Sequence, residues 1–175
     1  TLILMMCLSF TVFPMKGQGR PKIFVDPKDN IFSTETTDVG DTFVIEIRTS
    51  DWADRGLYSY EFKLYYDPAL LNVTKAEYPA GHFLDVEDKF MITIMDKIDY
   101  AQGIILFGGT RTGDVPGLTG SGTFAKVTFK IIKAPPPDLS CDLTIRDITF
   151  LDPRGPPDGV VTEYDVVNGY YEFTA

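Results

Sequence analysis

The sequence predicts an all-β fold, a jelly-roll β-sandwich of eight or nine strands. Apolar residues recur in short runs, and most of these runs alternate with polar residues as half-buried strands do. The 12 Pro and 15 Gly are spread among these runs and mark the turns between them. No stretch has a convincing helical period, and 175 residues suit one domain with a core of its own.

The first two strands are expected at 21–26 and 42–49. The second of these alternates along its whole length, which is typical of a strand with one buried face. The polar stretch 27–38 between them is expected to form turns. After them, 50–55 is expected to be an acidic loop that holds the only tryptophan, Trp52.

The clearest strand is 56–67, and Asp67-Pro68 ends it because proline has no N–H for a sheet ladder. Successive side chains of a strand point to opposite faces, so only one set lies in the core. The expected core set is Tyr60, Phe62, Leu64 and Tyr66, and the opposite set is Ser59, Glu61, Lys63 and Tyr65.

The rest of the chain predicts six more strands, at 71–77, 90–96, 103–108, 123–133, 141–150 and 166–173. The run 103–108 is apolar on both faces, as in a covered central strand or in a face that awaits a partner. Alternation within 141–150 shifts phase near Arg146-Asp147, which indicates a bulge. Loops or turns are expected between the strands, at 78–88, 110–122, 134–138 and 152–158.

Residues 1–19 are interpreted as a secretory signal peptide, followed by a domain at 20–175. The stretch 2–13 is apolar but shorter than the ~20 residues that span a bilayer. The chain begins with Thr1 and lacks a basic first segment, so we expect the start of the gene to be clipped. Two alternatives are a retained N-terminal strand or helix, and a strand inserted into a neighbouring subunit.

The composition argues against several functions. A net charge of −9 disfavours a nucleic-acid partner and adsorption to an anionic membrane. His82 is the only histidine and reads as an ordinary loop residue, so no nucleophile–histidine pair is suggested. No cleft with paired carboxylates is evident either, so we expect no enzymatic activity and no cofactor. Cys7 lies in the leader, which leaves Cys141 as a lone thiol, and we expect Cys141 to be a small buried hydrophobic residue at the start of its strand.

Two further sites are candidates on residue type alone. Calcium prefers several carboxylate and carbonyl oxygens, and acidic residues cluster in two loops. The calcium candidates are Asp51 and Asp54 in one loop and Asp152, Asp158 and Asp165 near another. Asn72-Val73-Thr74 is a glycosylation sequon, which makes Asn72 a candidate for glycosylation.

Several motifs together resemble the cohesin family. Gly40-Asp41-Thr42 is followed by Tyr60-Glu61-Phe62-x-Leu64-x-Tyr66-Asp67-Pro68 and then by Leu70-Leu71-Asn72-Val73. The stretch 120–130 resembles the family's Gly-x-Phe-Ala-x-Val-x-Phe strand, and Val167-Asn168-Gly169-Tyr170 resembles its closing strand. The resemblance covers nearly all of 23–173.

Cohesins are non-catalytic β-sandwiches that bind calcium-folded dockerin modules on one sheet face. The resemblance places that face on the strands at 56–67, 90–96, 103–109 and 141–150, with Glu61 as the acidic residue that bonds to dockerin. An acidic residue of the family is replaced here by Gly108, Gly109 and Thr110. The partner-binding residues it implies are Ser59, Glu61, Lys63, Tyr65, Ile104 and Leu106.

The resemblance therefore implies a secreted or surface-attached docking module that binds dockerin-bearing proteins in extracellular polysaccharide degradation or surface assembly. A carbohydrate-binding module of the same fold is the first alternative, since families 2 and 3 of those modules are relatives. Exposed aromatic rings would then bind sugar, with Trp52, Tyr58, Tyr65, Tyr78 and Tyr100 as candidates. A structural subunit of a cell surface or filament is the second alternative. Membrane insertion of the mature domain is not expected.

Overall fold

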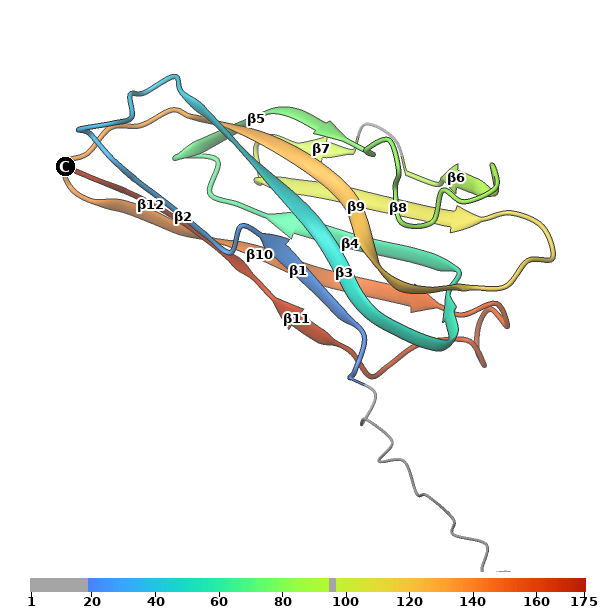
Figure 1. Ribbon diagram of the computed structural model, residues 1–175. Helices are drawn as coiled ribbons and strands as arrows, with labels where there is room; N and C mark the ends of the chain where they lie inside the picture. The colour runs from blue at the N-terminus through green and yellow to red at the C-terminus, as the bar shows by residue number, and fades with distance from the viewer. Residues whose placement is uncertain (1–18, 95–96) are drawn as a thin grey trace, which may run out of the picture.

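The computed structural model describes residues 19–94 and 97–175. In this part of the chain every regular element is a strand, and two sheets pack face to face as a sandwich (Figure 1). The signal-peptide prediction lies outside the described residues except for Gly19, and so do Met95 and Asp96 of the expected strand 90–96. No helix within the described residues is long and apolar enough to cross a membrane.

The first sheet has five strands. In spatial order they are β11 (Asp165–Val167), β1 (Lys22–Asp26), β3 (Thr42–Leu57), β9 (Leu118–Ile131) and β5 (Leu71–Glu77). Neighbours are antiparallel except for β1 and β11, which are parallel.

The second sheet has seven strands. In spatial order they are β2 (Asp29–Ser33), β12 (Gly169–Thr174), β10 (Leu139–Leu151), β4 (Ser59–Tyr65), β8 (Ile104–Arg111) and β6 (Phe90–Ile92), with β7 (Ile98–Asp99) also paired to β8. Only β2 and β12 are parallel. The all-β sandwich is confirmed, although the described residues contain more strands than the eight or nine expected.

The core lies between the two sheets and is rich in aromatic rings. The core set expected for the 56–67 strand is confirmed, because all four of its members are buried. Tyr60 stacks on Phe124 of the opposite sheet with 4.2 Å between ring centroids. Trp52 meets Phe150 edge-on at 5.1 Å. Such pairs across the interior join β4 and β10 to β3 and β9, which fixes the outer face of β4 toward solvent.

Two stretches expected to be irregular are strands. Asp29–Ser33, placed in a turn region, forms β2, because its backbone pairs with the distant β12. The expected acidic loop 50–55 continues β3, which pairs with β9 through register shifts on either side of Trp52. Asp51 and Asp54 have φ values of 64° and 53° there, and these left-handed residues break the alternation that the prediction relied on.

Several further boundaries differ from expectation. The strand expected at 90–96 is regular only over β6, which ends at Ile92, and β8 extends to Arg111. β9 begins at Leu118, inside the expected glycine-rich loop. The expected strand 166–173 is divided between the two sheets at Asn168, whose Oδ1 accepts a hydrogen bond of 2.9 Å from the Ile145 N–H. The expected bulge in β10 is confirmed by a register shift between Arg146 and Thr149.

Candidate functional site

The outward face of β4, β8 and β10 brings the six sequence-predicted binding residues together. Lys63 of β4 lies opposite Leu106 of β8, and Tyr65 lies opposite Ile104. Core-facing residues alternate with these along both strands and are buried. The pleat therefore presents Ser59, Glu61, Lys63, Tyr65, Ile104 and Leu106 on one surface, which we call the β4–β8–β10 face.

The centre of this face is apolar and slightly hollow. Ile104 and Leu106 are half-buried, and with Ile98 they contribute apolar side chains to a surface depression of about 300 Å³. Lys63, Lys97 and Asp99 complete its lining. An apolar floor with charged residues around it is typical of a surface that buries a partner's side chain.

A polar cluster lies beside the depression, at the bulge of β10. The Asp147 carboxylate accepts hydrogen bonds from Lys63 Nζ at 2.8 Å and from the Tyr65 hydroxyl at 3.0 Å, both through Oδ2. The Arg146 guanidinium lies over the Tyr65 ring, 5.7 Å from its centroid. The hydrogen bond between Lys63 and Asp147 lowers the pKa of the Asp147 carboxyl and raises the pKa of the Lys63 amine. Both groups are therefore charged at neutral pH.

The two remaining predicted residues differ in their surroundings. Ser59 Oγ donates a hydrogen bond of 3.3 Å to the Gly109 carbonyl and is thus tied to the sheet. Glu61 is exposed and lies opposite Gly108, which has no side chain to cover it. The Glu61 carboxylate is thereby open to a partner that approaches the face.

Sequence reasoning did not assign Arg146 and Asp147 to the site. The sequence carried one signal for them, the phase shift that predicted a bulge. It carried no signal for their contacts, because these depend on which residues of β4 lie opposite the bulge.

The calcium candidates are not gathered into a site. Asp152 is buried and accepts hydrogen bonds from Arg154 Nε at 3.0 Å and Nη2 at 2.6 Å, which hold the pKa of its carboxyl below the usual value. Asp51 accepts a hydrogen bond of 2.6 Å from Ser50 Oγ. Asp158 and Asp165 are exposed. Within residues 19–94 and 97–175, no three His, Cys, Asp or Glu side chains form a group that suits a metal ion.

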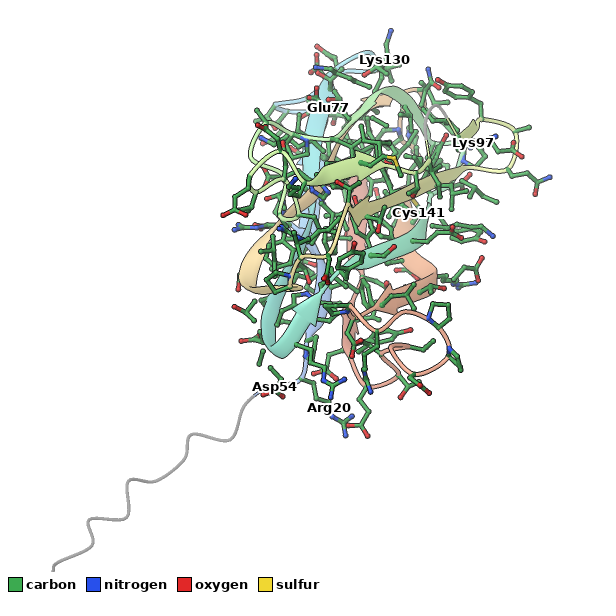
Figure 2. All side chains as sticks on the ribbon, turned by 90° about the vertical axis from the view of Figure 1, so that its right-hand side faces the viewer. Arg20, Asp54, Glu77, Lys97, Lys130 and Cys141 are labelled. Carbon is green, nitrogen blue, oxygen red and sulfur yellow. The ribbon has the colours of Figure 1, made fainter. Side chains whose placement is uncertain are left out.

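The end of the sandwich where these residues lie is a mixed-charge surface. Asp51, Asp54 and Glu163 line a depression of about 220 Å³ there together with Arg20. Figure 2 shows Asp54 and Arg20 at this end, far from Lys130 at the opposite end of the molecule. The cationic side chains among the acids oppose the accumulation of charge that a calcium site needs.

Most aromatic candidates for sugar binding are engaged elsewhere. Trp52 is 5% exposed, and its Nε1–H donates to Thr49 Oγ1 at 2.6 Å. The Tyr78 hydroxyl donates to the Ile94 carbonyl at 2.8 Å, and that of Tyr58 donates to the Gly113 carbonyl at 2.6 Å. Tyr100 is 56% exposed and is the candidate most open to solvent.

The structure also gives the surroundings of three other residues that the sequence analysis singled out, namely His82, Cys141 and Asn72. His82 is a loop residue, as expected, and its side chain is buried. Cys141 is partly buried on β10, where burial raises the pKa of its thiol. Asn72 is exposed on the edge strand β5, and its glycosylation stays a prediction.

Residues 30–153 match the family model described as the Cohesin domain. The fold is similar to a chain of a type I cohesin–dockerin complex from Clostridium thermocellum (19% identity, TM-score 0.64, 89% of this chain and 94% of that one). It is similar to the third cohesin of ScaC from Acetivibrio cellulolyticus, solved with the ScaB dockerin (14% identity, TM-score 0.66, 89% of this chain and 99% of that one). It is also similar to a non-cellulosomal cohesin from Archaeoglobus fulgidus (16% identity, TM-score 0.56, 90% of this chain and 93% of that one). A search of curated proteins finds no match.

Proposed function

The chain belongs to the cohesin domain family, and from this premise we propose that it is a non-catalytic docking module whose partner is a dockerin-bearing protein. The observation that carries the proposal is the β4–β8–β10 face. It combines a half-buried apolar centre, Ile104 and Leu106, with polar side chains that are already held in place.

The physical argument concerns what a docking surface must supply. Removing the apolar residues at the centre from water makes association with a partner more favourable. The polar groups around them set the register of the partner through hydrogen bonds. Glu61 offers an exposed carboxylate acceptor on the same face, which suits a hydrogen-bond donor on the partner.

We propose further that the module works outside the cell, either secreted or attached to the cell surface, in polysaccharide degradation or surface assembly. The net charge of −9 and the apolar stretch 2–13, which we interpret as a signal peptide, support this setting. The domain would then comprise residues 20–175.

The test is a binding measurement against purified dockerins, including those of Clostridium thermocellum and Acetivibrio cellulolyticus. The protein is immobilised, each dockerin is applied in calcium, and a chelator is then added to unfold the dockerin. We expect at least one dockerin to bind in calcium and to be released by the chelator. Retention on insoluble polysaccharide without binding to any dockerin would contradict the proposal.

A further inference from the structure

The bulge of β10 places one residue where it organises the β4–β8–β10 face. We infer that Asp147 is a positioning residue, which holds Lys63 and Tyr65 in their binding conformations before a partner arrives. This inference rests on the proposed docking function and adds a residue that neither the sequence motifs nor the family match assigned.

The bulge is what brings Asp147 to the outer surface. Lys63 lies opposite Arg146 and Glu61 lies opposite Thr149. Between these two pairs β10 advances by three residues and β4 by two, so β10 contains one extra residue. In a regular strand the residue after the outward-facing Arg146 would point into the core. The extra residue, with Asp147 at φ 52°, turns the carboxylate outward instead.

From that position one carboxylate controls two side chains of the neighbouring strand. Asp147 Oδ2 accepts from Lys63 at 2.8 Å and from the Tyr65 hydroxyl at 3.0 Å. The Arg146 guanidinium adds a further contact to this arrangement by lying over the Tyr65 ring. Both strands belong to the central part of the sheet, so the carboxylate is anchored on a rigid frame.

Holding these side chains in advance favours binding. A free lysine has many rotamers, and ordering such a side chain on association reduces affinity. Asp147 orders Lys63 in the free protein and also compensates its charge, so the partner need not provide a carboxylate for it. The partner therefore meets a fixed surface on which Glu61 is an exposed anion.

The inference is tested by a double-mutant cycle on dockerin affinity with the full chain. Asp147→Ala should weaken binding about tenfold, because two side chains then have to be ordered on association. In a Lys63→Met, Tyr65→Phe background the same change should alter affinity by less than about twofold, since nothing is left to position. Asp147→Asn keeps a carbonyl acceptor and suits the left-handed backbone, so it should retain part of the affinity.

The matched control is Asp142→Ala, because Asp142 is exposed on the same strand but lies opposite Tyr170, away from Lys63. It should leave the affinity unchanged. An equal loss for Asp147→Ala in both backgrounds would mean direct contact with the partner, and no loss in either would mean that the face forms without it. Both outcomes overturn the inference.

A second measurement needs no partner. The titration of Lys63, followed through the ¹³C shift of its ε carbon by NMR, should move to lower pH in Asp147→Asn than in the wild type. An unchanged midpoint would overturn the positioning role in the free protein. If the titration moves as expected but the wild type binds no dockerin, the proposed docking function fails, and the role of Asp147 in docking fails with it.

Discussion

The Tyr60 hydroxyl lies 2.7 Å from Nε2 of His82, and both side chains are buried between the sheets. His82 Nδ1 accepts a hydrogen bond of 3.0 Å from the Leu84 N–H, so the neutral ring carries its proton on Nε2 and donates it to Tyr60. The imidazole also stacks on Phe90 with 4.0 Å between ring centroids. A second proton would have to sit on Nδ1, where it would face the Leu84 N–H.

This arrangement predicts that acid destabilises the protein before its carboxylates titrate. Burial lowers the pKa of His82 from 6.5 to about 3 in the folded state, so the unfolded state takes up the proton first. The stabilising effect of keeping the His82 imidazole neutral is fully present above the pKa that His82 has in the unfolded state. It is lost progressively as the pH falls below that value. We expect a loss of about 1.4 kcal/mol for each pH unit between pH 6.5 and pH 4.5, measured by urea unfolding.

Two variants separate His82 from other groups. His82→Asn should be less stable at neutral pH but should lose the slope, because no imidazole remains to titrate. Tyr60→Phe should keep the slope. A wild-type stability that stays flat down to pH 4.5 would show that the folded protein accepts the proton readily.

The sequence predicted those parts of the fold that are set by local alternation. The burial of Tyr60 and its partners on β4 follows from a period of two, and β5 has the bounds expected for it. β2 was missed because it is held by the distant β12 rather than by its own pattern. The candidate site follows the same rule: alternation and resemblance were enough to place Glu61 and Leu106 on the outward face, whereas placing Asp147 there needs the register between β4 and β10.

Gly109 on β8 predicts a second stability effect. A Cβ at this position would collide with the Phe90 ring, with 2.7 Å to Cζ, and would lie 3.3 Å from Tyr60. Phe90 cannot yield freely because it stacks on His82. Gly109→Ala should therefore lower the free energy of unfolding by about 1–3 kcal/mol in chemical denaturation.

The control is Thr110→Ala on the same strand, where the side chain is half-buried on the outward face. Its effect should be smaller than that of Gly109→Ala, because it removes atoms rather than adding them to a packed core. Equal stability of Gly109→Ala and the wild type would mean that β6, which carries Phe90, shifts without cost.

The contact between Asp152 and Arg154 predicts a third effect. Arg154→Ala leaves a buried carboxylate without its guanidinium partner, so the melting temperature at neutral pH should fall. Arg154 lowers the pKa of Asp152, so its stabilising effect is present above pH 3.8 and fades as the pH falls below that value. The penalty of the variant should fade over the same range.

An exposed arginine provides the comparison. Arg20 lies 3.7 Å from Glu163 in an exposed ion pair, and Arg20→Ala should leave the melting temperature unchanged. Adding calcium to the wild type should also leave the melting temperature unchanged, because the Asp152 carboxylate is already hydrogen-bonded to Arg154. A calcium-dependent rise would reinstate the acidic loops as a metal site.

The last prediction concerns the centre of the β4–β8–β10 face. Leu106 is half-buried on the outward side of β8, opposite Lys63. An arginine there can reach solvent in the free protein but would be desolvated beneath a partner, so Leu106→Arg should weaken dockerin binding by about 2 kcal/mol or more. Its thermal melt should stay cooperative. Val44→Arg makes the same change on the outer face of the other sheet, where Val44 is 50% exposed, and should bind as the wild type does. Loss of the cooperative melt in Leu106→Arg would make Leu106 a core residue, and equal loss of binding in both variants would mean that net charge, not the face, governs docking.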